Sequence, residues 1–533
     1  MNGMNLLYRR IKLLYFLFLL VFYSCTGQHG YENGETDFPY EEWTIEDFRQ
    51  GYEDGSLSVR EVVEAYLKRI AEIDQAGPEL QSVLQVNPDA LAIADSLDQL
   101  RIEGNVTGIL FGIPVLLKDN LDTHDKMATT AGSRALAGSM PLKDSFVARK
   151  LRESGAVILG KANLSEWANF RGELSSSGWS GIGGQTKNPY YLDRNPCGSS
   201  SGSAVSVSAN LSVLAIGTET NGSIVCPSHA SGIVGIKPTV GLVSRSGVIP
   251  ISFTQDTPGP MARTVRDAAI ALGCLVGVDP EDEKTLASAG NYQSDYLPFL
   301  KEDGLKGKRI GWFKGPSGRN FKVDQLMERA VAQMESLGAT IVPIEQVEPS
   351  GTGSHSFEVM LYEYKDGLNR YFAGLGPKAP IRSLEDLISF NKEDSIALEN
   401  YNQVYLEQAQ EKGDLTDQAY LDALSSLNRM SREEGIDKVL QAQGLDAIIA
   451  PTGSPAWKTD LVNGDSFQLG SSSPAAHAGY PNITLPMGFV GGLPVGISVF
   501  GTAWSEPTLL EIAYAYEQGT HHRKPPKFIS GTH

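Results

Sequence analysis

Two loops made of small residues, and one lysine at the end of an apolar run, are the parts of this sequence that could carry hydrolytic chemistry. From Gly172 to Ser203, 15 of 32 residues are Gly or Ser, and a second small-residue loop follows from Gly217 to Ser223. Aromatic residues within the first loop are typical of an ordered segment whose backbone approaches another group closely, and not of a flexible linker. Lys118 directly follows the apolar run from Ile109 to Leu117. Because the two loops are close in sequence, we expect them to share one site.

One serine in the first loop also fits a different class of hydrolase. The segment from Gly198 to Gly202 matches G-x-S-x-G, in which Ser200 would be the nucleophile and a downstream histidine the base. Of the eight histidines, His477 is the best placed, because it lies in a small-residue loop far downstream. In a serine-rich loop the pattern arises easily by chance, and a single histidine is more often a packing or hydrogen-bonding residue. A serine esterase or peptidase of the α/β-hydrolase type therefore stays open as an alternative.

Other catalytic patterns are absent or badly placed. The S-x-x-K at Ser389 to Lys392 lies in a charged segment, and the chain has no K-T-G, which excludes a β-lactamase-like enzyme. There is no H-E-x-x-H or C-x-x-C, and His521 and His522 lie in a basic tail, so we expect no metal. No Gly-rich nucleotide-binding pattern follows a predicted strand. Hydrolysis without a cofactor remains.

The elements that must position these residues alternate between strand and helix. The run 109–117 is predicted as a buried strand, 146–152 as a helix and 156–159 as a second short strand. This order implies a parallel βαβ unit, in which ligands bind beyond the carboxyl ends of the strands, where Lys118 lies. A further predicted strand at 213–216 leads into the second small-residue loop. The fold class is therefore α/β.

Composition divides the chain into an N-terminal part and a catalytic part. A capping box of Ser58 and Glu61 predicts a helix near the start of the folded region, which we place at residues 57–533. Residues 25–56 are polar and rich in acids, and are predicted as a solvated acidic spacer. Residues 280–440 carry more charge and ordinary helices but no motif, and we expect this region to lie on the substrate side.

The first 24 residues are typical of a secretory signal peptide. Three basic residues precede an apolar run from Leu13 to Tyr23, which at 11 residues is shorter than the ~20 needed to span a bilayer. Cys25 after a small residue resembles the end of a bacterial lipoprotein signal, so lipid on Cys25 would attach the mature protein to a membrane; simple secretion is the alternative. We expect an exported protein, periplasmic or anchored to the outer membrane in a bacterium.

Charge and cysteine content narrow the partners. The formal net charge is −18, and it becomes −21 when residues 1–24, which carry three basic residues and no acid, are removed. A chain this acidic has no electrostatic reason to bind nucleic acid or an anionic membrane surface. With Cys25 lipidated, Cys197, Cys226 and Cys274 remain, too few for a disulfide framework, so at least one thiol stays free.

Four ordered segments resemble the amidase signature family. Cys197 to Ala204, CGSSSGSA, is similar to the family's GGSSGGS segment, and Gly217 to Pro227, GTETNGSIVCP, resembles its nucleophile loop. Ile113 to Asp119 is similar to the strand that ends in the family's catalytic lysine, and PNITLP with GLPVG, at 481–496, resembles its C-terminal sheet region. The likeness covers residues 57–525. It implies a single large α/β domain whose mixed, mostly parallel central sheet is covered by helices on both faces.

The resemblance implies a catalytic triad without histidine. Ser223 would be the nucleophile, Ser199 a proton relay that follows a cis peptide bond, and Lys118 the base. A lysine can act as a base only when neutral, which near pH 7 requires a pKa about three units below its usual value; burial beside the apolar strand would supply this.

The resemblance also implies an oxyanion hole made by the backbone N–H groups of Thr220, Asn221, Gly222 and Ser223. The family usually has Gly where this chain has Asn221. Asn tolerates a positive φ better than most residues, so this difference is compatible with the same loop geometry.

Within the family, the run from Gly217 to Arg263 and the segment KANLSEWANF at 161–170 look most like bacterial peptide amidases. The implied reaction is hydrolysis of a small-molecule or peptide primary amide to carboxylate and ammonia, through an acyl-enzyme on Ser223. Two further alternatives remain. One is a tRNA-dependent amidotransferase of the same family, of the A-subunit type, against which the export signal argues. The other is a non-catalytic binding lipoprotein, against which the complete triad argues.

Overall fold

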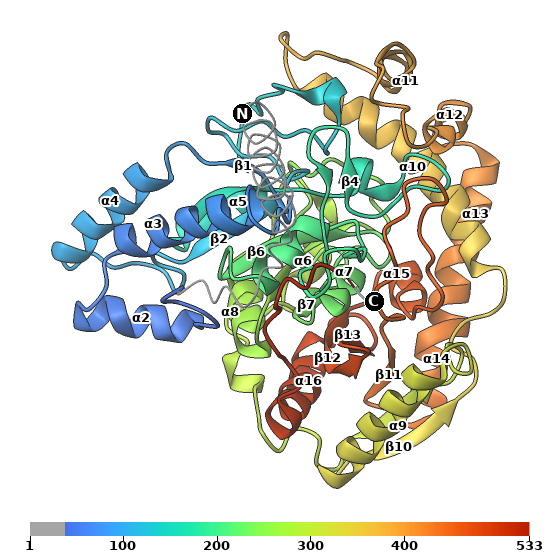
Figure 1. Ribbon diagram of the computed structural model, residues 1–533. Coiled ribbons are helices and arrows are strands. Elements are labelled where there is room, and N and C mark those ends of the chain that lie inside the picture. Colours follow the sequence, from blue (N-terminus) through green and yellow to red (C-terminus); the bar gives the residue numbers. More distant parts are fainter. Residues whose placement is uncertain (1–37, 532–533) are drawn as a thin grey trace, which may run out of the picture. The chain divides into compact units, whose positions relative to one another are not determined.

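The computed structural model describes residues 38–531, and from Tyr40 onward they form one compact unit built on a large sheet (Figure 1). The predicted signal peptide at 1–24 and the lipid site at Cys25 lie outside the described residues. Among the residues from 38 to 531, no helix has both the length and the apolar character needed to cross a membrane.

The central sheet is mixed and has 11 strands. Their order across the sheet is β1 (Val83–Val86), β3 (Val157–Ala162), β2 (Pro114–Lys118), β6 (Leu214–Glu219), β8 (Thr257–Ala262), β7 (Val234–Lys237), β12 (Asn482–Val490), β13 (Leu493–Phe500), β11 (Ala447–Pro451), β9 (Arg309–Phe313) and β10 (Thr340–Ile344). Parallel pairs form two groups, β3–β2–β6 and β11–β9–β10, and antiparallel pairs join these groups through the middle of the sheet. The prediction of a single α/β domain with a mixed central sheet is confirmed.

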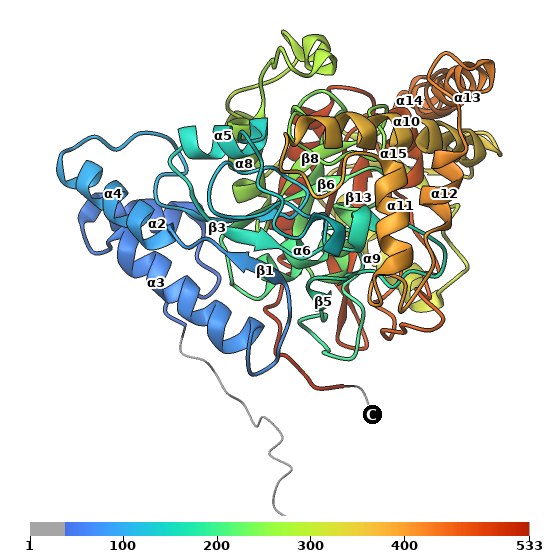
Figure 2. The same ribbon diagram turned by 90° about the horizontal axis from the view of Figure 1, so that it is seen from above.

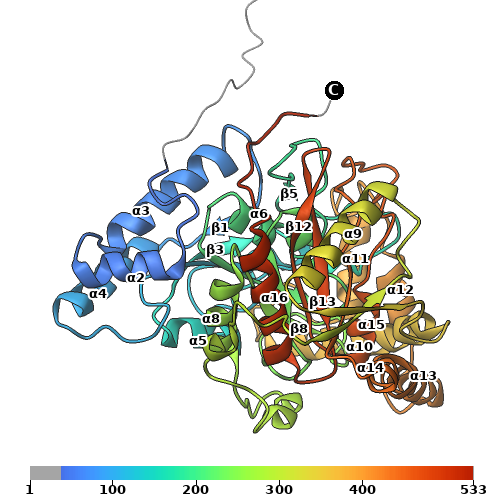
Figure 3. The same cartoon turned by 90° about the horizontal axis from the view of Figure 1, so that it is seen from below.

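Helices cover both faces of this sheet (Figures 2 and 3). The helices that pack on it include α3 (Val59–Arg69), α5 (Phe146–Glu153), α6 (Ser201–Ser208), α7 (Val225–Ala230), α8 (Val265–Leu275), α9 (Phe321–Ser336) and α16 (Glu506–Thr520). Helix α16 contacts α8 and α9, whereas α6 contacts α7. Every residue of α6 and α7 is buried, which their small side chains permit. The predicted βαβ unit is β2–α5–β3, with β2 and β3 parallel.

The fold begins earlier in the chain than the composition predicted. The acidic spacer predicted at 25–56 is corrected in its described part, because helix α2 (Ile45–Asp54) starts at a capping box of Thr44 and Asp47. The buried residues of α2 are Ile45, Phe48, Gly51 and Tyr52. The acids of α2 lie on its exposed side, so a composition count conceals its apolar face. Helix α3 starts at the predicted capping box of Ser58 and Glu61.

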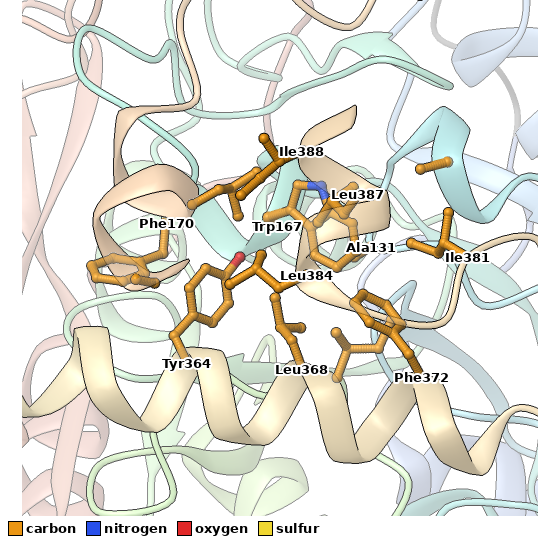
Figure 4. Close-up of a cluster of buried hydrophobic side chains, with 14 of the residues drawn as sticks. Ala131, Trp167, Phe170, Tyr364, Leu368, Phe372, Ile381, Leu384, Leu387 and Ile388 are labelled. Atoms are coloured by element: carbon orange, nitrogen blue, oxygen red, sulfur yellow. The ribbon is translucent and has the colours of Figure 1, made fainter. Parts of the chain in front are cut away.

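The motif-poor region 280–440 contributes a group of helices beside the first small-residue loop. They include α10 (Thr352–Gly374), α11 (Leu384–Glu393), α12 (Val404–Gln410) and α13 (Gln418–Asn428). A buried apolar cluster joins Leu368 and Phe372 of α10 and Leu384 of α11 to Trp167, just before that loop (Figure 4). The rings of Trp167 and Phe372 meet edge to face, with 6.2 Å between their centroids. This region is therefore packed onto the segment that leads to the predicted site.

Candidate active site

Lys118 and the two small-residue loops meet at one edge of the sheet. Lys118 is the last residue of β2, which runs parallel to β6, so both strands end at the same edge. Strand β6 continues directly into the second loop. The Lys118 Nζ atom lies 2.8 Å from Ser199 Oγ, and the Ser200 N–H donates to the Ser223 carbonyl oxygen at 3.1 Å. The fold thus brings together the residues that the sequence predicted as a triad.

The two serines differ in access. The peptide bond between Gly198 and Ser199 is cis, as the resemblance implied. Ser199 and Lys118 are fully buried, whereas Ser223 is 8% exposed. Of the three residues, Ser223 is therefore the one that keeps some exposed surface.

Three oxygen atoms surround the amine of Lys118. Its Nζ atom lies 2.8 Å from Ser199 Oγ, 2.9 Å from Thr218 Oγ1 and 3.1 Å from the Thr218 carbonyl oxygen. Burial lowers the pKa of Lys118 from 10.5 to about 7, although the carboxylates of Asp256 and Glu219 favour the charged form. Near neutral pH, much of the amine is unprotonated, with two N–H groups for Thr218 and a lone pair toward Ser199. The amine can therefore accept a proton from the Ser199 hydroxyl.

A buried carboxylate shapes the second loop. Glu219 accepts hydrogen bonds from the N–H groups of Gly222 at 2.8 Å, Ile224 at 2.8 Å and Val225 at 3.0 Å. This corrects the predicted oxyanion hole in one respect, because the Gly222 N–H already has a partner. Within residues 38–531, the N–H groups of three other loop residues donate to no protein acceptor: Thr220, Asn221 and Ser223. These three donors can bind a developing negative charge.

The chain matches the family model Amidase over residues 61–510. It belongs to the amidase signature family. A probable amidase of Arabidopsis thaliana is 43% identical to this amidase over 506 residues, which cover 92% of this chain and 93% of the relative. The solved structure of the native peptide amidase from Stenotrophomonas maltophilia is 49% identical, has a TM-score of 0.89 and covers 92% of this chain and 99% of its own. The A-type component of the glutamyl-tRNA(Gln) amidotransferase of Microcystis aeruginosa is 36% identical over 482 residues, which cover 88% of this chain and 96% of the relative.

The alternative chemistries find no support in the geometry of this amidase. The Ser200 hydroxyl donates to the Thr218 carbonyl oxygen at 3.1 Å and accepts from the Thr218 N–H at 3.2 Å, and Ser200 has no exposed surface. His477 Nδ1 instead lies 3.0 Å from a Glu348 carboxylate oxygen. Ser200 and His477 therefore do not pair. Within the described part of the chain, no group of three or more His, Cys, Asp or Glu residues could hold a metal ion.

A disulfide joins the first loop of the amidase to helix α7, which follows the second loop. Cys197, next to the cis peptide, is bonded to Cys226, the second residue of α7. Trp457 and Ala230 pack against this pair in a small buried cluster. The cysteine count predicted at least one free thiol, and Cys274 is free and buried. The bonded pair was not predicted, since its members are 29 residues apart and only the fold brings them together.

The roles of three more residues at the site, Thr218, Glu219 and Asp256, were not predicted from the sequence. Thr218 holds the lysine amine, and Glu219 orders the second loop. Asp256 accepts from the Thr220 hydroxyl at 2.6 Å, and burial raises the pKa of Asp256 to about 6. Thr218 and Glu219 could have been noticed from their place at the end of a strand, but Asp256 lies in a distant segment that carries no signal beyond the family resemblance.

Proposed function

We propose that this amidase hydrolyses a linear primary carboxamide, a C-terminal peptide amide or a similar compound, to a carboxylate and ammonia. The observation that carries the proposal is the 2.8 Å contact between the buried Lys118 amine and the Ser199 hydroxyl, beside the Ser223 loop. The 49% identity to the peptide amidase of Stenotrophomonas maltophilia, over nearly all of both chains, supports a peptide amide as the substrate.

In the first half of the proposed reaction, Ser223 Oγ attacks the carbonyl carbon of the amide. Its proton passes to Ser199 Oγ while the Ser199 proton passes to the neutral Lys118 amine. A C–O bond forms and the carbonyl electron pair moves onto oxygen, which gives a tetrahedral oxyanion. When the C–N bond breaks, the proton on Lys118 returns through Ser199 to the leaving nitrogen, which departs as ammonia. An ester of Ser223 remains.

In the second half, water attacks this ester with the same relay taking its proton. The oxyanion formed in each half is stabilised by the backbone N–H groups of Thr220, Asn221 and Ser223, which lack protein acceptors. Glu219 supports this role because it holds the neighbouring backbone in place through three hydrogen bonds. When the bond from the acyl carbon to Ser223 Oγ breaks, the proton on Lys118 returns through Ser199 to Ser223 Oγ, which restores the serine and the neutral amine. The acid released ionises to the carboxylate.

The tRNA-dependent amidotransferase and the non-catalytic lipoprotein are less well supported. The identity to the Microcystis amidotransferase is 36%, compared with 49% to the peptide amidase. A binding protein would have no need of a lysine with a pKa of about 7 in contact with a serine hydroxyl.

We propose that the amidase acts outside the cytoplasm. The disulfide between Cys197 and Cys226 supports this location, because disulfides persist in oxidising compartments. Residues 1–24 would be removed and Cys25 would carry lipid. Cell fractionation of the full chain and of Cys25→Ala tests this proposal: the wild type should be found with membranes and the variant in the soluble exported fraction, and a cytoplasmic wild type would refute it.

The activity is tested by measuring ammonia release from a panel of amidated peptides and small carboxamides. Ser223→Ala is the blank, and free peptide acids are the control substrates. We expect release from peptide amides by the wild type and none by the variant. Equal release by both proteins, or release from no amide by the wild type, would refute the proposal.

A further inference from the structure

The side chain of Asn221, in the Thr220–Ser223 turn, bonds to a segment far away in the sequence. The Thr220 hydroxyl donates to the buried Asp256, and the Gly222 N–H donates to Glu219, the residue before the turn. Asn221 is exposed, and its amide bonds to residues about 250 positions later: the Ser472 hydroxyl donates to Asn221 Oδ1 at 2.7 Å, and Asn221 Nδ2 donates to Ser473 Oγ at 3.3 Å. The oxygen and the nitrogen of the Asn221 side-chain amide therefore both bond to the segment formed by Ser472 and Ser473.

The segment to which Asn221 bonds is itself held by hydrogen bonds to helix and sheet residues. Ser472 precedes helix α15 (Ser473–Ala478), and its carbonyl oxygen accepts from the Ala476 N–H at 3.0 Å. The preceding Ser471 hydroxyl donates to the carbonyl oxygen of Pro451, the last residue of β11, at 2.9 Å. Through these bonds Asn221 is connected to the central sheet.

The Ser472 hydroxyl bonds to Asn221 and not to the backbone of the helix that it precedes. A serine at the start of a helix commonly accepts a hydrogen bond from a backbone N–H of the first turn. Ser472 makes no such bond, and its hydroxyl is used on Asn221 instead. Ser472 also lies beside the next residue, because a side-chain carbon added at Gly222 would come within 3.1 Å of Ser472 Oγ. Ser472 therefore lies against two residues of the turn, Asn221 and Gly222.

From this geometry we propose that Asn221 is a positioning residue for amide hydrolysis, which fixes the oxyanion-binding N–H groups by fastening their turn to Ser472 and Ser473. The inference rests on the proposed function. The three N–H groups without protein acceptors belong to Thr220, Asn221 and Ser223, so the fastened residue is the middle one of the three donors in the turn. Misplacing such donors by a fraction of a bond length weakens transition-state binding more than substrate binding.

The test is a double-mutant cycle on the full chain with an amidated peptide as the substrate. We expect Asn221→Ala to lower kcat about tenfold with KM within about twofold, as for a loss felt mainly in the transition state. Ser472→Ala should lower kcat in the same direction, and the double variant should be no slower than Asn221→Ala, because both changes break one connection. The matched control is Asn105→Ala, at an exposed asparagine whose side-chain amide donates to Glu103.

The kinetic results distinguish a failure of the role proposed for Asn221 from a failure of the proposed amidase function. A wild-type kcat in Asn221→Ala, or losses that multiply in the double variant, would overturn the inference while leaving the amidase activity in place. A fall in kcat matched by a large fall in Tm would also overturn it, since that indicates a purely structural role. A wild type that releases ammonia from no amide would instead refute the proposed function.

Discussion

The pH dependence of the reaction is the sharpest consequence of the buried Lys118. Its pKa is lowered from 10.5 to about 7 by burial, so about half of the amine is neutral at pH 7. The neutral fraction falls to about one tenth at pH 6 and about one hundredth at pH 5. If the neutral amine is the base, kcat/KM for ammonia release should rise with unit slope below pH 7 and level off above it.

The carboxylate of Asp256 provides a test of whether the fall in kcat/KM at low pH, the acid limb of the profile, comes from Lys118. Asp256 raises the pKa of Lys118, so Asp256→Asn should lower that pKa and move the acid limb of the profile to lower pH. The pKa of Asp256 itself is about 6, so the limb could also arise from protonation of this carboxyl group. In that case Asp256→Asn would abolish the limb instead of moving it.

The assay is kcat/KM for one amidated peptide from pH 5 to pH 9 at constant ionic strength, for the wild type and for Asp256→Asn. The retained fold of the variant is checked by its Tm. Three results would refute the neutral-lysine base: a wild-type profile that is flat down to pH 5, a limb that Asp256→Asn abolishes, or a limb that moves to higher pH in this variant.

The unfolded chain binds the Lys118 proton between pH 7 and 10.5 and the folded chain does not, so the destabilising contribution of Lys118 should shrink as the pH rises across this window. Lys118→Met should abolish activity yet raise the free energy of unfolding at pH 7, by up to about 5 kcal/mol, and this gain should shrink as the pH rises. Urea denaturation measures both effects, and a destabilised Lys118→Met would contradict them. Replacing Cys197 and Cys226 together by Ala should lower the free energy of unfolding by about 3.5 kcal/mol, as expected for a crosslink spanning 29 residues, and a reductant should destabilise the wild type but not this variant. His477→Ala should keep its activity on peptide amides, and a loss as large as that of Ser223→Ala would revive the histidine-based alternative. Dialysis against EDTA should leave ammonia release unchanged, whereas inactivation that added metal reverses would disprove a metal-free mechanism.

Local patterns in the sequence were sufficient for many elements of the fold. The strands predicted at 156–159 and 213–216 are β3 and β6, each of which starts one residue later and ends three residues later, and the helix predicted at 146–152 is α5, one residue longer. The run before Lys118 was predicted as a strand from 109, but β2 starts at Pro114, because residues 109–113 form turns that lead into the sheet. Apolar periodicity and caps act between neighbours in the chain, so they are visible without the fold.

For the site, the sequence by itself determined which chemical groups were present: a lysine at the end of an apolar strand and two serine-bearing loops. It could not show that the Ser200 hydroxyl bonds to the Thr218 backbone, or that Glu219 accepts from the Gly222 N–H while the N–H groups of Thr220, Asn221 and Ser223 keep no protein acceptor. The disulfide and the contact of Asn221 with Ser472 join residues 29 and 251 positions apart. Only the tertiary structure decides such contacts, because the partner of a hydrogen bond or thiol depends on which distant segments the packed sheet and helices bring within a few ångströms.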